Sequence, residues 1–384
     1  MTEKVLVIHG GAPTAVLNSS LYGILAEADQ NLSAVGKVIA ARGGSGGLLR
    51  EDFFNLNLLT EKDRENLLYT PGTVIGTSRD QLGPGEYKRM AEIIKKNEIS
   101  IVLYNGGNGS MDACGKLAQA CEGTKVRVVG IPKTIDNDLA ATDHAPGFGS
   151  AARYLAGTVG EIAVDIRSMP IHVCVIEAMG RNVGWLTAAS CLADTGGVPV
   201  LACIPELGFC EDVFFSRVEE LSQKHGGVIV VVSEGLKHED KAPLVEPVLQ
   251  VGRSVYYGDV GTHLANSIIK KLGIKARSEK PGIIGRSSSV WQSAVDRDEA
   301  VLAGKAALKV ALEGQSGVMV AFRRRIGPQY EIKTVTVPIE EVMLHERALP
   351  AEFWNQDAFG ATEAFRQWCM PLLGGPLPAY ARSV

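Results

Sequence analysis

Short runs of apolar and β-branched residues alternate along the chain with longer segments in which apolar residues recur at helical spacing. The short runs predict strands that are buried on both faces, and the longer segments predict amphipathic helices. We expect strands at residues 4–9, 35–40, 99–104, 126–131, 172–176, 198–204, 228–232 and 282–284. We expect helices at residues 15–29, 85–96, 110–121, 149–166 and 211–224. This alternation is typical of an α/β fold in which helices cover both faces of a parallel sheet.

Length and charge add a domain count and exclude several classes of function. The chain has 384 residues, of which 46% are hydrophobic and 21% are charged, which is enough for two domains of about 100–200 residues each. We place a domain break near residues 147–149. The formal net charge is −4, so the chain offers no broad basic surface to nucleic acid or to an anionic membrane. We expect neither as a partner.

The first residues and the cysteines indicate the compartment. Residues 5–8 already belong to a predicted strand, and the regions of a signal peptide do not precede it. The seven cysteines are scattered and form no Cys-x-x-Cys pair, which predicts free thiols in a reducing environment. No apolar run approaches the roughly 20 residues that cross a bilayer. We therefore expect a cytoplasmic protein.

Glycines cluster where two predicted strands end. The first strand leads into Gly10 and Gly11, and the third leads into residues 105–110 (NGGNGS). Glycines let the backbone approach an anion closely, and a helix that follows offers unpaired N–H groups. The first loop is no Walker A sequence and fits a plain tight turn equally well. The second loop predicts a phosphate-binding site, and the alternative is that Ser110 is only an N-cap.

An acidic segment follows the fourth predicted strand, at residues 132–138 (PKTIDND). In an extended stretch residues i and i+2 point to the same side, so Asp136 and Asp138 would face one site. Phosphoryl transfer needs one carboxylate to accept the proton of the acceptor hydroxyl and another to hold Mg²⁺. It also needs a cation beside the migrating group, which Lys133 could supply. A polar turn rich in Asp and Asn is the alternative.

Taken together, these segments resemble the phosphofructokinase family. The resemblance rests on residues 10–13 (GGAP) with Asn18, 76–79 (GTSR), 106–110 (GGNGS), 130–138 (GIPKTIDND), 147–149 (GFG), 177–185 (EAMGRNVGW), 205–206 (PE) and 233–235 (SEG). These occur in the family's order and cover about residues 4–300. The resemblance implies two Rossmann-like three-layer αβα domains with mostly parallel sheets. Residues 1–147 plus about 287–340 would bind the phosphoryl donor, and residues 148–286 plus about 341–384 would bind the sugar phosphate.

The resemblance also implies roles for single residues. Asp136 would deprotonate the 1-hydroxyl of fructose 6-phosphate, while Lys133 and Thr134 would act on the transferring phosphoryl group. Mg²⁺ is the expected cofactor, with Asp138 and Asn108 as its ligands. The residues expected at the donor site are Gly11, Arg79, Gly107, Asn108, Gly109 and Ser110. The residues expected at the sugar phosphate are Thr134, Asp136, Met179, Gly180, Arg181, Glu234, Arg277 and Arg286.

Several positions bear on the donor and the acceptor. Pyrophosphate users of the family commonly carry Asp at the position of Gly109, where it repels the α-phosphate of ATP, so Gly109 favours ATP. Pyrophosphate users also carry lysine at the position of Lys133, as this chain does. Asn108 stands where many ATP users have Asp. His172 and Ile283 stand where bacterial ATP users have an arginine and a histidine close to the sugar phosphate.

The resemblance therefore implies Mg²⁺-dependent phosphoryl transfer from ATP or pyrophosphate to fructose 6-phosphate, in glycolysis, by a homodimer or homotetramer. His172 and Ile283 leave open another sugar phosphate or a polyol as acceptor. Asn108 leaves open a non-catalytic regulatory subunit. A dinucleotide-dependent oxidoreductase is disfavoured, because Asp29, the acidic residue near the required distance from the first glycines, lies inside a predicted helix.

Overall fold

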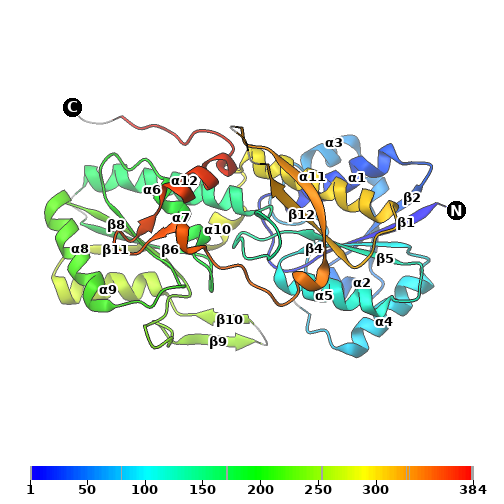
Figure 1. The fold of residues 1–384 in the computed structure, drawn as a ribbon, viewed down its shortest axis with the longest axis horizontal. Helices are drawn as coiled ribbons and strands as arrows, with labels where there is room; N and C mark the ends of the chain where they lie inside the picture. Colours follow the sequence, from blue (N-terminus) through cyan, green and yellow to red (C-terminus); the bar gives the residue numbers. More distant parts are fainter. Residues whose placement is uncertain are drawn as a thin grey trace. The chain divides into compact units, whose positions relative to one another are not determined.

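The computed structural model describes residues 2–78, 80–169, 172–251, 254–325, 327 and 329–381. The chain forms two compact units (Figure 1), each built from two separate stretches of sequence. Unit 1 comprises Met1–Phe148 and Ala294–Arg347, and unit 2 comprises Gly149–Ser293 and Ala348–Val384. The first crossing of the chain coincides with the glycines at residues 147–149. The second and third crossings come after residues 293 and 347, later than the 286 and 340 expected from the sequence.

Unit 1 contains a seven-stranded sheet in which the five central strands are parallel. The antiparallel edge strands are β13 and β3. The strand order is β13 (Ile332–Pro338), β12 (Val318–Arg324), β5 (Arg127–Pro132), β4 (Ile101–Gly106), β1 (Glu3–His9), β2 (Val35–Ala41) and β3 (Phe53–Asn55). The buried central strands are almost wholly apolar, as expected for a sheet with helices on both faces.

Helices cover both faces of this sheet and complete a three-layer αβα unit. On one face lie α1 (Leu17–Gln30) and α11 (Ala294–Leu312). On the other lie α2 (Gly44–Leu49), α4 (Pro84–Lys96) and α5 (Asn108–Ala120). Glycines allow α1 and α11 to touch, because a Cβ on Gly23 would lie 2.1 Å from the Val301 carbonyl oxygen and one on Gly304 would lie 2.0 Å from that of Ser20. The second stretch of unit 1, which begins with α11, is thereby packed against the first stretch.

Unit 2 contains a four-stranded parallel sheet in the order β11 (Ala276–Glu279), β6 (Val173–Ala178), β8 (Val228–Ser233) and β7 (Val200–Cys203). Two helices, α8 (Glu211–His225) and α9 (Val260–Leu272), pack on one face. The long helix α6 (Phe148–Ser168) crosses the opposite face (Figure 1). Strands β9 (Pro247–Val251) and β10 (Ser254–Tyr257) of this unit pair with each other in an antiparallel arrangement.

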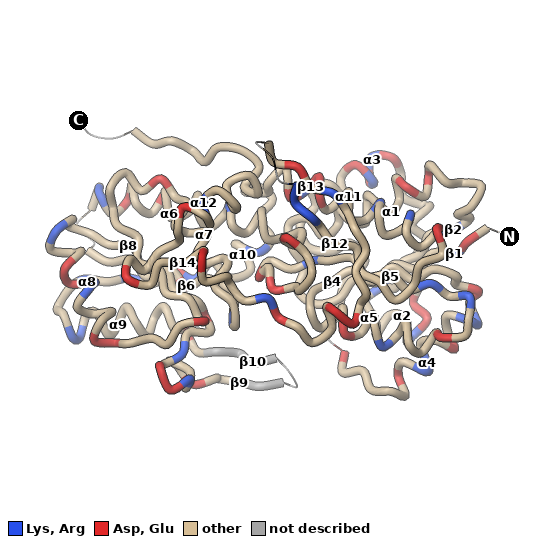
Figure 2. The backbone as a smooth tube through the Cα atoms, in the orientation of Figure 1, with Lys and Arg blue, Asp and Glu red and all other residues tan. Residues whose placement is uncertain are grey.

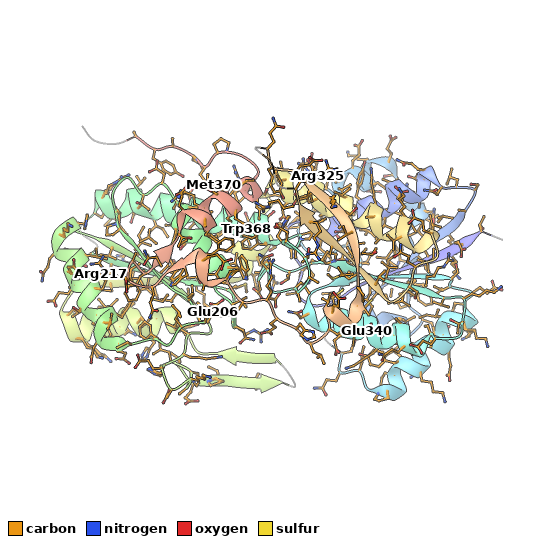
Figure 3. All side chains as sticks on the ribbon, viewed as in Figure 1. Glu206, Arg217, Arg325, Glu340, Trp368 and Met370 are labelled. Carbon is orange, nitrogen blue, oxygen red and sulfur yellow. The ribbon has the colours of Figure 1, made fainter. Side chains whose placement is uncertain are left out.

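The last segment of the chain folds onto unit 2 through aromatic side chains. Trp185, at the start of α7 (Trp185–Ala189), lies 5.0 Å from Trp368 and 6.0 Å from Phe353 between ring centroids. Trp368 belongs to α12 (Glu363–Cys369) and is labelled with Glu206 in Figure 3. Glu206 accepts hydrogen bonds from the backbone N–H of Gly184 at 2.8 Å and from that of Leu349 at 2.9 Å. The segment that precedes α7 is therefore tied to the C-terminal segment of the same unit.

The α/β fold and two-domain arrangement predicted from the sequence are confirmed. All five predicted helices and seven of the eight predicted strands overlap observed elements. The strand expected at residues 282–284 is wrong, because this segment begins α10 (Gly282–Ser287) and Ile283 and Ile284 are 67% and 69% exposed. The strand nearby is β11, whose side chains are mostly polar because it forms an edge of its sheet.

The charged residues and the cysteines are distributed over both units. Acidic and basic residues are interspersed in both units (Figure 2). All seven cysteines are free thiols, and five of them are buried. Among the described residues, no helix is both long and apolar enough to span a membrane.

Candidate active site

Four segments of unit 1 meet where its central strands end. Strands β1, β4 and β5 are neighbours and parallel, so their carboxyl ends share one edge of the sheet, where ligands bind in folds of this class. The N–H of Gly10 donates to the Asn105 carbonyl at 2.8 Å, and that of Lys133 donates to the Gly106 carbonyl at 3.0 Å. The Thr77 hydroxyl donates to the Gly11 carbonyl at 2.9 Å. The glycine loops, the segment at 76–78 and the acidic segment thus adjoin one another.

The second glycine loop is shaped by close approach. A Cβ on Gly106 would lie 2.1 Å from the Ser110 hydroxyl oxygen, and a Cβ on Gly107 would lie 3.2 Å from the Lys133 carbonyl oxygen. Around Gly109 a Cβ would meet nothing within 4 Å. Helix α5 follows with Gly107 as its N-cap and no side-chain cap. The alternative that Ser110 is only an N-cap is therefore wrong.

Lys133 is buried directly beneath the first glycine loop. Lys133 is only 3% exposed, and its Nζ donates a hydrogen bond to the Ala12 carbonyl at 2.6 Å. A Cβ on Gly11 would lie 3.5 Å from the same Nζ. His9 lies nearby, and burial together with the positive charge of Lys133 lowers the pKa of His9 to about 3. The histidine is therefore neutral, and Lys133 places a positive charge at this edge of the sheet.

The acidic segment is held together by Asp138. The Thr134 hydroxyl donates to Asp138 Oδ1 at 3.0 Å and accepts from the backbone N–H of Asp136 at 3.1 Å. The Asn108 amide donates to Asp138 Oδ2 at 2.7 Å, which joins the acidic segment to the second glycine loop. The other side-chain atom of Asn108, Oδ1, is buried without a hydrogen-bond partner. An acceptor in that position needs a donor or a cation to complete it.

The backbone around the acidic residues differs from the expectation. Asn137 has a φ of 56°, so residues 136–138 are not extended. The expectation that an extended backbone makes Asp136 and Asp138 point to the same side is therefore wrong. The Asn137 side chain instead accepts from the backbone N–H of Ala145 at 3.1 Å. A left-handed residue between the two carboxylates turns the chain there, and asparagine tolerates that conformation better than most residues. Arg79, also expected at this site, lies outside the described residues.

A buried ionic network lies behind the acidic segment, and the sequence did not indicate it. His144, 1% exposed, contacts Asp143 through Nδ1 at 2.8 Å and Glu299 through Nε2 at 2.6 Å. The Tyr330 hydroxyl donates to Glu299 at 2.5 Å, and Arg324 contacts Asp143 at 3.0 Å. Burial would lower the pKa of His144, but the two carboxylates raise it to about 9. His144 is therefore a buried imidazolium that joins the segment after β5 to α11.

This network predicts a pH dependence of stability. Because the pKa of His144 rises from 6.5 to about 9 on folding, its stabilisation is complete below pH 6.5 and disappears as the pH rises through 9. A shift of this size corresponds to about 3 kcal/mol. We expect His144→Gln to lower the free energy of unfolding by about that amount at pH 6.5, and to differ little from the wild type at pH 10. Urea denaturation at both pH values measures this.

The control is His345→Gln, which removes an exposed histidine of the same unit. It should leave the free energy of unfolding nearly unchanged at both pH values. An equal loss of stability for His144→Gln at pH 6.5 and pH 10 would show that the charge of His144 does not contribute.

In unit 2, the residues expected at the sugar lie at the ends of β6 and β8. Ala178 and Ser233 are paired in register, which brings residues 179–181 next to Glu234. The Ser233 hydroxyl donates to the Gly180 carbonyl, and the N–H of Glu234 donates to the Ala178 carbonyl at 2.9 Å. Burial raises the pKa of Glu234, although Arg181 opposes this rise. Met179, Gly180, Arg181 and Glu234 therefore form one cluster.

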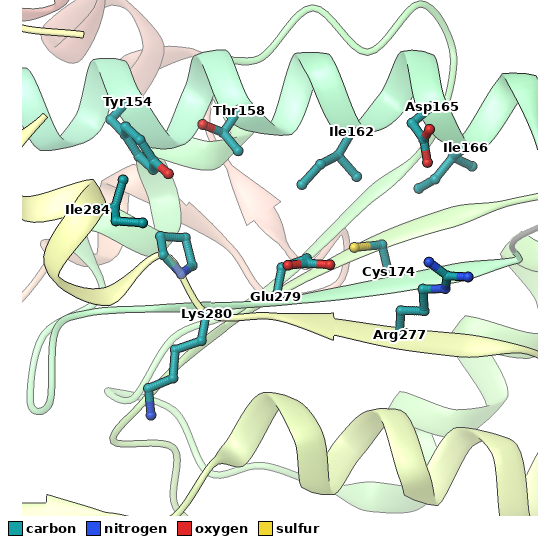
Figure 4. A pocket seen from close by; sticks show the side chains of 11 residues that line it. Tyr154, Thr158, Ile162, Asp165, Ile166, Cys174, Arg277, Glu279, Lys280 and Ile284 are labelled. Carbon is teal, nitrogen blue, oxygen red and sulfur yellow. The ribbon is translucent and has the colours of Figure 1, made fainter. Parts of the chain in front are cut away.

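The two arginines expected at the sugar phosphate are placed on different elements. Arg277 lies on β11 and lines a cavity of about 370 Å³ between that strand and α6 (Figure 4). Tyr154, Thr158 and Asp165 line it from the helix. Arg286 lies on α10, outside that lining. The cavity mixes two acidic side chains with Arg277 and Lys280, so it has no strong excess of either charge.

The sequence of this chain is similar to those of known phosphotransferases. A family model described as phosphofructokinase matches residues 4–311. Pyrophosphate–fructose 6-phosphate 1-phosphotransferase of Xanthomonas campestris pv. campestris (strain B100) is 34% identical, over 98% of this chain and 92% of its own. The sulfofructose kinase of Alkalicoccus urumqiensis is 29% identical, over 97% and 96%.

Solved structures agree with these similarities in sequence. The crystal structure of pyrophosphate-dependent phosphofructokinase from Nitrosospira multiformis superimposes with a TM-score of 0.90 at 31% identity. The superposition covers 100% of this chain and 95% of the Nitrosospira chain. The glycine loops and the acidic segment lie within the part of the chain that the family model matches. With its fold and nearly its whole length shared in this way, the chain belongs to the phosphofructokinase family of phosphotransferases.

Proposed function

We propose that this protein transfers a phosphoryl group from ATP or pyrophosphate to the 1-hydroxyl of fructose 6-phosphate, forming fructose 1,6-bisphosphate. The observation that carries the proposal is that the acidic segment contacts both glycine loops. Asn108 of the second glycine loop donates to Asp138 of the acidic segment at 2.7 Å, and Lys133 reaches the first glycine loop at 2.6 Å. One edge of the sheet thus presents a cation, glycine loops and carboxylates, which phosphoryl transfer requires.

We propose the following chemical roles, which rest on the family resemblance together with these contacts. The acceptor hydroxyl oxygen attacks the terminal phosphorus, the bond from phosphorus to the leaving group breaks, and Asp136 takes the hydroxyl proton. Lys133 stabilises the negative charge on the transferring group, and Thr134 contacts both substrate and transition state. The donor's phosphates lie against Gly11, Gly107, Gly109 and Ser110, where α5 begins. Arg79 is proposed for the donor from the family resemblance alone.

Mg²⁺ fits the available donor set. Among the described residues no group of three or more His, Cys, Asp or Glu side chains could enclose a metal. Mg²⁺ in such sites usually takes one or two protein oxygens and completes its shell with water and substrate phosphates. Asp138 and the unpartnered Oδ1 of Asn108 offer those oxygens. When bound, Mg²⁺ neutralises phosphate charge.

For the sugar phosphate we propose the cluster of Met179, Gly180, Arg181 and Glu234 in unit 2, together with Arg277 and Arg286. Arginine suits phosphate oxygens because its guanidinium presents several donors in a plane. The raised pKa of Glu234 still leaves a side chain that can bond sugar hydroxyls in either protonation state. We propose a cytoplasmic homodimer or homotetramer acting in glycolysis, on the family resemblance and, for a reducing compartment, the free thiols.

The donor is where two observations disagree. The open space around Gly109 leaves room for the α-phosphate of ATP, whereas two relatives that are 34% identical to this chain are named for pyrophosphate. We favour ATP, because the donor loop carries no carboxylate at Gly109 to repel it. His172 and Ile283 keep a second acceptor in view, and one relative is named for sulfofructose.

The experiment is a matched pair of assays on the purified protein with Mg²⁺ and fructose 6-phosphate, one with ATP and one with pyrophosphate. We expect fructose 1,6-bisphosphate from ATP. Product from pyrophosphate alone would reverse the donor assignment and leave the acceptor intact. If neither donor yields product, a panel of sugar phosphates, sulfofructose and polyols decides between another acceptor and a non-catalytic subunit.

A further inference from the structure

Arg347 is the last residue of unit 1. It contacts the backbone at both ends of the segment 137–143, which begins within the acidic segment and is called the acidic loop. Its NH1 donates to the carbonyls of Thr142 at 2.6 Å and Asp143 at 2.5 Å. Its NH2 donates to the Asn137 carbonyl at 3.2 Å, and its backbone N–H donates to the Asp138 carbonyl at 2.8 Å. One side chain therefore bridges the start of the segment 137–143 to its end.

The bridged segment contains two residues in an unfavourable backbone conformation. Asn137 has a φ of 56° and Ala141 a φ of 61°. A residue with a Cβ adopts left-handed geometry only at a cost, so surrounding contacts must hold it there. Arg347 binds carbonyl groups on both sides of Ala141, and Leu139 forms an isolated antiparallel bridge with Glu346, the residue before Arg347. The segment 346–347 thus acts as a clamp on the loop.

The charge of Arg347 also matters at this place. Burial lowers the pKa of Arg347 to about 10, while Asp143 and Asp138 oppose that shift. The guanidinium is therefore still charged at neutral pH, close to the carboxylate that accepts from Asn108 and Thr134. A positive charge there offsets the repulsion between Asp138 and the phosphates of a bound donor.

We propose that Arg347 is a positioning residue for phosphoryl transfer: it fixes the segment 137–143, which contains Asp138 and directly follows Asp136, in the geometry that the reaction uses. The inference rests on the proposed function, in which Asp136 is the base. Arg347 itself contacts backbone carbonyls, and its effect would pass through the loop. Misplacement of a reacting group by about 1 Å can lower a rate by about 10²-fold, so loss of the clamp should affect the chemical step more than binding.

The experiment compares Arg347→Gln and Arg347→Lys with the wild type. For Arg347→Gln we expect kcat to fall by about 10- to 100-fold, with KM values for both substrates changed by less than about threefold. Added guanidinium ion should restore part of the lost kcat. Lysine should recover less than the ion does, because an ammonium group cannot bond several carbonyls in one plane. Hydrogen exchange at the backbone amides of residues 136–143 should become faster.

The matched control is Arg325→Gln, which removes an exposed arginine of the same unit that pairs with Glu331 at 2.8 Å. It should leave kcat, exchange in residues 136–143 and the response to guanidinium unchanged. The proposal is overturned if Arg347→Gln retains wild-type kcat, or if exchange in residues 136–143 is unaltered. A wild type that is inactive with both donors contradicts the proposed function and the catalytic part of this inference. The exchange measurement then decides separately whether Arg347 holds the loop.

Discussion

Replacing Asp136 with asparagine should lower kcat with fructose 6-phosphate by about 10²–10⁴-fold, the range for loss of a general base. The asparagine has nearly the same shape and cannot accept the proton of the attacking hydroxyl. The backbone N–H of residue 136 still donates to the Thr134 hydroxyl, so the loop should keep its conformation. Steady-state kinetics give kcat, and calorimetric titration with fructose 6-phosphate gives the binding constant, which we expect to change by less than about fivefold.

The control for this substitution is Asp52→Asn, which removes an exposed carboxylate of unit 1 whose contact with Arg42 is 3.9 Å long. It should keep wild-type kcat. If Asp136→Asn retains kcat within tenfold of the wild type, Asp136 is not the base. If it loses sugar binding and rate in equal measure, its role is binding rather than proton transfer.

The sequence was most informative where function requires short contiguous motifs. The glycine loop at 105–110 and the acidic segment at 132–138 each follow a buried strand, and ligands bind at the carboxyl ends of parallel strands, so each could be predicted as part of a site. The contact between Asn108 and Asp138 results from the pairing of β4 with β5 as parallel neighbours. Apolar strands were equally clear, because burial on both faces leaves an uninterrupted run of β-branched residues.

The sequence was least informative where the site depends on residues far away in the chain. Glu299 and Arg347 contact the residues that follow the acidic segment, His144 and Thr142, from about 150–200 positions away, and neither lies in a motif. A single buried histidine such as His144 gives no local signal of Glu299, and the adjacent Asp143 does not by itself show that the pair is buried. The polar edge strand β11 was missed for a different reason: it lacks the apolar run of a buried strand, whereas the exposed Ile283 and Ile284 imitate one.

The failures to predict Glu299 and Arg347 have a common physical origin. Unit 1 is built from two stretches of sequence, and the second stretch supplies α11, two strands and Arg347. Local patterns report which residues are buried, but not which distant partner buries them. The left-handed residues Asn137 and Ala141 belong to the same class, since their conformation is maintained by contacts that close only in the folded unit.

Gly109→Asp should convert the donor preference from ATP towards pyrophosphate. The new carboxylate would face the position proposed for the α-phosphate of ATP, and unfavourable pairing of like charges costs several kcal/mol, which corresponds to about 10²–10³-fold in kcat/KM for ATP. Pyrophosphate has only two phosphates, which correspond to the β- and γ-phosphates of ATP, and therefore has no group at the α position. The activity with pyrophosphate should be unchanged or improved. Parallel assays with the two donors measure the ratio directly.

The structure makes this substitution a clean test of charge. A Cβ at Gly109 would meet nothing within 4 Å, and the residue lies in the first turn of α5, with Gly107 as N-cap. An acidic residue there suits the helix dipole and replaces a poor helix former, so thermal stability should stay equal or rise. Gly109→Asn is the matched control, because it has the same size without the charge.

The three proteins together separate the explanations of donor choice. Loss of ATP use in Gly109→Asp with retention in Gly109→Asn would assign the choice to electrostatic repulsion at this position. Equal loss in both variants would assign it to space. If the wild type uses pyrophosphate alone, the absence of a carboxylate at Gly109 does not admit ATP, and Lys133, buried beneath the first glycine loop and bonded to Ala12, becomes the residue whose replacement must be tested next.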